Sequence, residues 1–412
     1  MAAPKPSERR QILEDIFRSA LAAAHGRRCV SQALAACGNA GSWSAVAVGK
    51  AAEAMTDGAC DVLGARLGRA LVVRKAGLAC GSAVPGPRIE VIDAAHPVPD
   101  ASSLEAGRRV CEFVDKTAVD DNVLILISGG ASSLIERLPS TVSLEQWQRL
   151  NRWLLRSGLE IHAINAIRRH VSRLKGGGLL RYLGGKHVYG LMLSDVPGDA
   201  PEAIGSGLLS PVGESAPVAT LPGWARTLIE NAGSETVGAA GPAELTMGVV
   251  ANNTTAMRAA LTHARKLGIV ARRGSGRLGG EAVEIARDLV AELRAGAPGA
   301  AVWGGETTVT LPSHAGRGGR NLHLALAAAI AIVGRDDLSL LAASTDGDDG
   351  NSGCAGAIVD GETLRLGRAQ GLDPVRCLAA FEAARFLEAA GATLVTGATG
   401  TNVADLAIGL RV

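Results

Sequence analysis

Four glycine-rich polar loops in the last third of the chain constrain its fold more than any other feature. Three of them directly follow a short apolar run: 304–306 follows 300–303, 344–350 follows 338–343, and 396–402 follows 393–395. The fourth, 316–321, opens a helix rich in Ala and Leu. Apolar runs that end in glycine and hydrogen-bonding side chains are typical of the carboxyl ends of strands in a parallel α/β sheet. Because ligands bind outside those ends, the loops predict an α/β fold with a ligand site at a sheet edge.

The composition of these loops indicates the chemistry of the ligand. Glycine leaves backbone N–H groups accessible and Arg320 adds a positive charge, and both suit a phosphate or a carboxylate. Asp346 and Asp349 share one loop, and paired carboxylates suit Mg²⁺. Asp residues in such loops also form Asx turns and helix caps, so this alternative stays open. The loops predict an enzyme that handles phosphate.

Length and composition fit a globular protein of two or three domains. The chain has 412 residues, 53 glycines, 3% aromatic residues and a net charge of +2. Interspersed charges and scarce aromatic residues argue against a nucleic-acid or membrane surface. The seven cysteines are scattered without a CxxC pair, which indicates reduced thiols. No signal peptide is evident, and no apolar run reaches the roughly 18 residues of a spanning helix. We expect a cytoplasmic protein without nucleic-acid or membrane partners.

The N-terminal part alternates between expected strands and helices. This alternation predicts parallel sheets in both domains. The Pro- and Gly-rich stretch 211–243 is expected to contain the junction, which gives domains of 1–240 and 241–412. The expected strands of the first domain are 45–48, 71–73, 91–92, 123–127 and 188–193.

Polar residues follow several of these expected strands. Lys50 stands between the first strand and the next helix, where a cation lies beside helix N–H groups and suits an anion. An ordinary surface lysine is the alternative for Lys50. Ser128-Gly129-Gly130 follows 123–127 and is expected to hold phosphate, while Asp195 follows 188–193. An acidic loop at such a strand end favours metal binding or base catalysis.

A helix that runs into Gly176 carries a polar stripe opposite its apolar face. The stripe recurs at spacings of three and four residues and has no obvious carboxylate partner. An anion-facing surface and a plain solvated surface explain it equally well. The stripe consists of Asn165, Arg168, Ser172 and Lys175.

One literal motif points to a different chemistry. Residues 274–279 match GxGxxG, follow the short run 267–271 and precede a helix that begins near Glu281, as in nicotinamide-dependent oxidoreductases. Arg272 and Arg273 interrupt the run where the strand should enter the turn, and the acidic ribose ligand is missing about 20 residues further on. We therefore give this motif little weight. A Walker A sequence is also absent, so phosphate transfer would proceed without a P-loop.

Taken together, these blocks resemble the class II glycerate kinases, the glycerate 2-kinase family whose C-terminal portion is called the MOFRL domain. The matching strings keep the family's order from Lys50 to Asp405, which is nearly the whole chain. They include VGKAA at 48–52, HPVPD at 96–100, LISGG at 126–130, LSDV at 193–196, GRGGRN at 316–321 and TGTNV at 399–403.

The resemblance implies a reaction and an architecture. It implies transfer of the γ-phosphoryl group of ATP to the 2-hydroxyl of D-glycerate, with Mg²⁺, to give 2-phosphoglycerate. It also implies an N-terminal Rossmann-like domain, a C-terminal α/β domain of the MOFRL type, and an active site in the cleft between them. Some family members carry the label hydroxypyruvate reductase, so an NAD(P)H-dependent reductase is the alternative. A homodimer stays open.

The resemblance also supports roles for single residues. Lys50 and Arg320 are expected to bracket the glycerate carboxylate and the transferred phosphoryl group, and Asp195 to act as the base or as a Mg²⁺ ligand. Asp346 and Asp349 are the expected metal ligands. The residues expected to bind substrate or nucleotide, undivided between the two, are Ser128, Gly129, Gly130, Asn165, Arg168, Lys175, Gly176, Ser206, Glu306, Asn321 and Asn402.

Several positions depart from the family pattern. Leu208-Leu209 stands where Pro-Thr is usual, and Ala398 and Ala404 replace a common Pro and a common Asn. The stretch 381–386 lacks an Asn-Asp-Ser string often found there. These changes affect loop shape more than charge, so they bear on substrate preference before reaction type.

Overall fold

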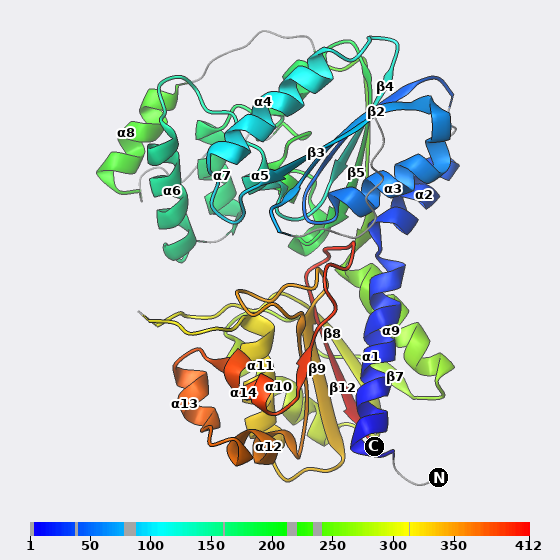
Figure 1. Cartoon of the computed structure of the whole chain (residues 1–412), viewed down its shortest axis with the longest axis vertical. Helices are drawn as coiled ribbons and strands as arrows, with labels where there is room; N and C mark the ends of the chain where they lie inside the picture. Colours follow the sequence, from blue (N-terminus) through cyan, green and yellow to red (C-terminus); the bar gives the residue numbers. More distant parts are fainter. Residues whose placement is uncertain are drawn as a thin grey trace. The chain divides into compact units, whose positions relative to one another are not determined.

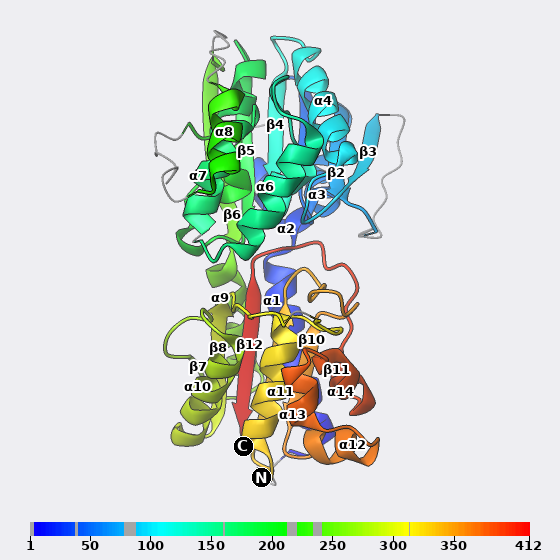
Figure 2. The same cartoon turned by 90° about the vertical axis from the view of Figure 1, so that its left-hand side faces the viewer.

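The computed structural model describes residues 4–37, 40–77, 88–159, 161–211, 221–233, 241–312 and 314–412. The chain folds into two compact units, one formed by residues 26–250 and the other by 1–25 together with 251–412 (Figures 1 and 2). The expected boundaries at 1–240 and 241–412 differ from these units, because the first 25 residues pack with the C-terminal part. Much of the expected junction at 211–243 lies outside the described residues.

The unit of residues 26–250 is built on a six-stranded sheet. Its strand order is β3-β2-β1-β4-β5-β6, and the pairs from β3 to β5 are all parallel. The strands are β1 (Trp43–Val48), β2 (Leu67–Lys75), β3 (Ile89–Ala94), β4 (Asn122–Ile127), β5 (His187–Ser194) and β6 (Glu244–Asn252). The apolar runs in β1 and β4 are buried on both faces, as expected of strands inside a doubly covered parallel sheet.

Helices cover both faces of this sheet. The helices α2 and α3 lie on one face, and α4 to α8 lie on the other (Figures 1 and 2). Ser143 and Gln146 form a capping box at the start of α6. The helices are α2 (Gly26–Ala36), α3 (Ala52–Leu63), α4 (Ala101–Asp115), α5 (Ala131–Leu134), α6 (Leu144–Arg156), α7 (Ile161–Val171) and α8 (Gly223–Ala232).

The second unit is built on a mixed six-stranded sheet. Its order is β11-β10-β9-β12-β8-β7, and among the named strands of the described residues only β7 and β8 pair in parallel. The strands are β7 (Ala271–Arg273), β8 (Gly299–Gly305), β9 (Leu338–Ser344), β10 (Gly356–Asp360), β11 (Thr393–Leu394) and β12 (Asp405–Arg411).

The prediction of a parallel sheet in the second domain is therefore wrong. The C-terminal strand β12 inserts between β8 and β9 and runs antiparallel to both. Since β8, β9 and β11 nevertheless run in one direction, the loops that follow them lie at the same edge of the sheet. The alternation of strand and helix fixes the direction of β8 and β9, but it leaves open which strand lies between them.

Helices also cover both faces of the second sheet. The N-terminal helix α1 (Pro6–Ala23) lies with α9 (Asn253–Lys266) on one face, and α10 to α14 lie on the other (Figures 1 and 2). Helices α10 and α11 and the strands form a core rich in Ala and Leu around Trp303. The remaining helices are α10 (Ala282–Ala295), α11 (Arg320–Ile332), α12 (Thr363–Ala369), α13 (Pro374–Ala379) and α14 (Ala383–Ala389).

Candidate active-site residues

The first sheet reverses its strand order between β1 and β4. From β1 the chain proceeds to β2 and β3 on one side, and it then returns to β4 and β5 on the other. Val48 pairs with Ile127, and Ile127 pairs with Met192, so β1, β4 and β5 end at one level. A crevice at such a reversal is the usual ligand site of an open α/β sheet. Lys50, the loop 128–130 and Asp195 follow these three strands directly.

The loops after β1 and β4 are joined by backbone hydrogen bonds. The Lys50 N–H donates to the Gly129 carbonyl at 3.0 Å, and the Ala51 N–H donates to Ser128 Oγ at 3.0 Å. A Cβ atom on Gly49 would lie 2.2 Å from Ser128 Oγ, so only glycine permits this approach. Ser128 is buried and serves as a support for the start of α3.

Gly130 lies between Lys50 and a residue that the sequence did not single out as a candidate. It has a φ of +87°, and a Cβ atom there would lie 3.0 Å from the His96 ring and 3.6 Å from Lys50 Cγ. The glycine therefore lets the half-buried Lys50 side chain and His96 approach the same loop. His96 belongs to the HPVPD string, which offered no spacing pattern of its own.

Asp195, the third candidate at this edge of the sheet, is half-buried in the loop after β5.

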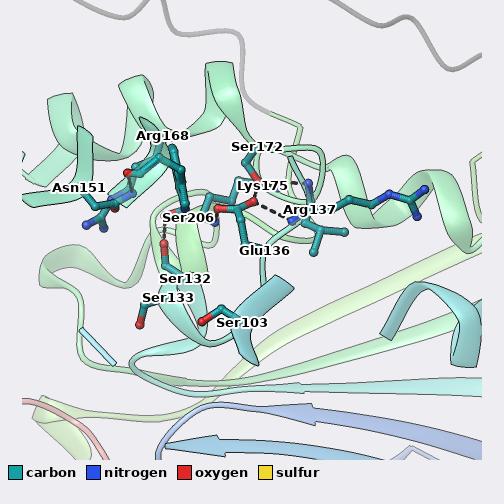
Figure 3. A network of polar contacts seen from close by, with 12 residues as sticks. Ser103, Ser132, Ser133, Glu136, Arg137, Asn151, Arg168, Ser172, Lys175 and Ser206 are labelled. Carbon is teal, nitrogen blue, oxygen red and sulfur yellow. Dashed lines mark hydrogen bonds and ion pairs between the residues drawn. The ribbon is translucent and has the colours of Figure 1, made fainter. Parts of the chain in front are cut away.

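The polar stripe of α7 is divided by the end of the helix. Helix α7 ends at Val171, because Ser172 Oγ accepts the N–H groups of Leu174 and Lys175, both at 3.2 Å. The Lys175 ammonium then turns inward to the Glu136 carboxylate, and both side chains are fully buried (Figure 3). Ser172 Oγ donates to the same carboxylate. The expectation that the stripe lacks a carboxylate partner is wrong for Lys175, which forms a structural ion pair.

Asn165, Gly176 and Ser206 are brought together. Ser206 Oγ donates to Asn165 Oδ1 at 3.0 Å and lies 2.7 Å from Ser132 Oγ at the start of α5. The Gly176 N–H donates to the Ser206 carbonyl at 3.0 Å. Ser206 has a φ of +60°, a left-handed conformation that these contacts hold in place. This cluster is linked through α5 to the loop 128–130.

Arg168 is buried on the same helix as Asn165. Its Nε donates to the side-chain oxygen of Asn151 at 2.9 Å (Figure 3). Burial lowers the pKa of its guanidinium, and the nearby Glu136 acts in the opposite direction.

In the second unit, Arg320 lies among carboxylates at the edge of the sheet. Asp405 at the start of β12 pairs with Gly305 at the end of β8 and with Ser344 at the end of β9. Arg320, the first residue of α11, forms ion pairs with Glu306 and with Asp405, the latter at 3.4 Å. Burial would lower the pKa of Arg320, but these carboxylates outweigh it and raise the pKa.

Asp405, like His96 in the first unit, lies at a sheet edge and was not among the candidates named from the sequence. Its side chain is 1% exposed, and its Oδ1 has no hydrogen-bond partner among the described residues. Burial raises the pKa of the Asp405 carboxyl to about 7, although Arg320 opposes the shift. The available signal was a single acidic residue at the start of an apolar strand, two positions after the TGTNV string.

The carboxylates of the two aspartates expected to bind Mg²⁺ accept hydrogen bonds from backbone N–H groups. Asp349 accepts the N–H groups of Asn321 at 3.1 Å and Leu322 at 2.8 Å, and so caps α11. Asp346 Oδ1 accepts from Ser344 Oγ and the Asp348 N–H in an Asx turn. Both are buried, and burial raises the pKa of Asp349 to about 6. No group of three His, Cys, Asp or Glu side chains among the described residues is arranged to hold a metal ion. The hydrogen bonds of both residues match the alternative of caps and turns.

The loop before β12 is fixed to the loop after β9. Thr345 Oγ1 donates to the Ala404 carbonyl at 2.6 Å and accepts the Val403 N–H at 2.9 Å. This arrangement places the buried Asn402 at the same edge as Arg320. Ala404 has a φ of +64°, a conformation for which the family's common Asn is better suited than Ala.

The GxGxxG segment does not have the geometry of a dinucleotide-binding turn. Strand β7 ends at Arg273, and residues 278–281 continue alongside β8 through bridges to Gly305 and Thr308 before α10 begins at Ala282. A dinucleotide fingerprint would instead pass directly from strand to helix. A Cβ atom on Gly274 would lie 1.8 Å from the Trp303 indole, so this glycine is explained by packing.

The fold defines a two-domain α/β protein, and in each domain the candidate residues lie in polar loops at one edge of the sheet. Residues 12–222 match a family model described as a domain of unknown function (DUF4147), and residues 299–405 match the MOFRL family. The chain is 38% identical to the D-glycerate 2-kinase of Thermotoga maritima, covering 89% of this chain and 90% of that relative. The chain therefore belongs to the glycerate kinase family with a MOFRL domain.

Further similar proteins support membership of this family. Human glycerate kinase is 30% identical, covering 87% of this chain and 82% of the relative. A crystal structure of glycerate kinase from Thermotoga maritima superimposes with a TM-score of 0.83 at 34% identity, covering 99% of this chain and 100% of the other. A protein from Agrobacterium vitis named a putative hydroxypyruvate reductase is 35% identical, covering 96% and 93%. Within the described part of this chain, no helix has the length and apolar character that a membrane span requires.

Proposed function

We propose that this protein phosphorylates the 2-hydroxyl of D-glycerate with ATP to give 2-phosphoglycerate and ADP. The observation that carries the proposal is the placement of Lys50 and the loop 128–130 at the strand-order reversal, in a chain 38% identical to a D-glycerate 2-kinase. A lysine side chain at this strand end suits an anionic substrate. Since ATP is a cytosolic cosubstrate, we place the reaction in the cytoplasm. Self-association and the expected cleft stay predictions.

Phosphoryl transfer requires alignment and charge stabilisation more than covalent chemistry. Lys50 and Arg320 bind the glycerate carboxylate and the transferred phosphoryl oxygens, and Arg320 exchanges its ion pair with Glu306 for substrate. Asp195 accepts the proton of the 2-hydroxyl as the oxygen attacks the γ-phosphorus. Gly129 and Gly130 contribute N–H groups for phosphate, and Ser128, whose N–H donates to the Val48 carbonyl at 3.0 Å, supports their loop. Gly176, Ser206, Asn321 and Asn402 shape the surrounding loops.

Mg²⁺ is expected with ATP, but Asp346 and Asp349 do not fit the role of ligands. Both carboxylate oxygens of Asp349 and Oδ1 of Asp346 accept backbone or hydroxyl hydrogen bonds that compete with a metal for those oxygens. Mg²⁺ commonly uses one or two carboxylates with substrate phosphates, so ATP can bring the ion already bound. Asp195 is the remaining candidate for a protein ligand. If Asp195 is the base, D195N loses kcat at every Mg²⁺ concentration; recovery at high Mg²⁺ would make it a metal ligand.

A coupled assay tests the reaction and its regiochemistry together. The purified protein would receive ATP, Mg²⁺ and D-glycerate, with enolase present and phosphoglycerate mutase absent. We expect phosphoenolpyruvate, because enolase accepts only the 2-phosphorylated product. ADP without phosphoenolpyruvate would refute phosphorylation at the 2-position. Consumption of NADH or NADPH with hydroxypyruvate, without ADP release, would support the reductase named for one relative.

A further inference from the structure

Arg168 is a buried cation whose hydrogen-bond partner is neutral. The residue is 9% exposed, and the one hydrogen bond that its guanidinium makes with the described residues is the 2.9 Å contact to Asn151 Oδ1. Asn151 itself is 1% exposed, and its Nδ2 donates to the Trp147 carbonyl at 2.9 Å. This second bond fixes the amide so that its oxygen faces Arg168 (Figure 3).

The neighbouring carboxylate does not compensate the charge of Arg168. Glu136 already accepts hydrogen bonds from the Lys175 ammonium, from Ser172 Oγ, and from the Arg137 N–H at 2.9 Å. Its negative charge is matched by the buried ammonium of Lys175. Within the described residues, the Glu136–Lys175 pair is therefore neutral as a unit, and Arg168 adds one uncompensated positive charge beside it.

A buried charge of this kind costs free energy when it has no counterion. Arginine cannot relieve the cost by losing its proton, because its intrinsic pKa is too high. An aspartate at position 151 could make the same hydrogen bond and would also neutralise the charge. The chain has the neutral isostere instead, which leaves the guanidinium available to an oxyanion with two parallel hydrogen-bond acceptors.

We propose that Asn151 is a positioning residue that holds Arg168 as an uncompensated receptor for an oxyanion of the substrates, a carboxylate or a phosphate. The inference rests on the proposed function, since both D-glycerate and ATP carry such groups. Asn165 lies one turn earlier on α7 and joins Ser206 and α5, so the receptor belongs to the framework behind the loop 128–130.

The N151D variant separates the receptor role from a structural role. It keeps the hydrogen bond to Arg168 and neutralises the guanidinium, but it loses the donor to the Trp147 carbonyl. We expect the KM of one substrate to rise at least tenfold and the KM of the other to change less than twofold, whatever change in melting temperature the lost bond to Trp147 causes. A rise for D-glycerate assigns the carboxylate, and a rise for ATP assigns a phosphate. Q146E is the control, because it adds the same charge to the exposed capping box of α6.

Two results would overturn the proposal. Unchanged KM values for both substrates in N151D would show that the charge of Arg168 does not serve binding. A fall in kcat together with a lower melting temperature, at unchanged KM, would make Asn151 purely structural. If the wild-type protein does not phosphorylate glycerate, calorimetry with inorganic phosphate still decides: weaker binding by N151D than by Q146E supports the receptor, and equal binding refutes it.

Discussion

We expect the buried carboxylate of Asp405 to lower the stability of the protein at neutral pH and above, and to support activity by orienting Arg320. Its pKa of about 7 in the folded protein lies above the ordinary value near 3.9, so the folded state binds the proton more tightly. This contribution is fully present below pH ~4 and is lost as the pH rises through about 7. We expect D405N to raise the free energy of unfolding at pH 8 by on the order of 2 kcal/mol, and by less at pH 5.

Denaturant titrations at pH 5 and pH 8 measure the effect on stability, and kcat/KM measures the effect on activity. D405N should lower kcat/KM about tenfold, because Arg320 loses a charged partner that orients it. D337N is the control of opposite sign: hydrogen bonds from Arg335 lower the pKa of Asp337, so its contribution is present at neutral pH and lost on acidification. Equal stability of D405N and wild type at pH 8 would contradict the prediction.

Lys50 is the residue from which we expect the largest single effect on turnover. Replacing Lys50 by Ala removes a cation from the strand-order reversal but leaves the backbone bond from Lys50 N to Gly129. We expect kcat/KM to fall by about 10²-fold or more with an unchanged melting temperature. The exposed Lys116 at the end of α4 supplies the control variant K116A. Near-normal turnover of K50A would remove Lys50 from the site.

At the scale of elements, the N-terminus of α11 tests whether Asp349 is a cap or a metal ligand. As a cap accepting two backbone N–H groups, it should cost about 2 kcal/mol of stability when replaced by Ala, and less when replaced by Asn. The Mg²⁺ concentration needed for half-maximal activity should stay the same in D349N. D348N is the neighbouring control. A shift of the Mg²⁺ requirement in D349N without loss of stability would restore the metal hypothesis.

Elements with local signals could be predicted from the sequence. Apolar runs that end in polar, glycine-containing loops predicted β1, β4, β5, β8 and β9. The end of α7 could not be predicted, because it depends on Ser172 competing for backbone N–H groups and on Glu136, 36 residues earlier. Lys175 was misjudged for the same reason: its partner is close in space but distant in sequence.

The sequence could propose those candidate-site residues that depend only on where a strand ends and which loop follows it. Lys50, Ser128 and Asp195 required only the positions of strand ends. Asp405 required the insertion of β12 between β8 and β9, a long-range pairing that no periodicity reveals. The role of Asn151 could not be predicted without knowing that α6 packs on α7, since a single asparagine on a core-facing helix forms no sequence pattern.

At the scale of the whole molecule, the first helix belongs to the last part of the chain. On α1, Leu13, Ile16 and Phe17 are at most 1% exposed, and Arg10 donates to the Thr393 carbonyl at 2.9 Å. Helix α1 packs against α9, β9 and β12, so the N-terminal residues complete the core of the unit that contains Arg320.

This discontinuity predicts where a defect in α1 becomes visible. F17A removes a fully buried aromatic side chain and should cost about 3–5 kcal/mol of stability. Hydrogen exchange followed by mass spectrometry should show faster exchange in peptides from 251–412 and unchanged exchange in peptides from 26–250. The exposed Arg18 on the same helix provides the control R18A. Faster exchange spread equally over both ranges would contradict the division into units, because a cavity under α1 would then loosen a core shared by the whole chain.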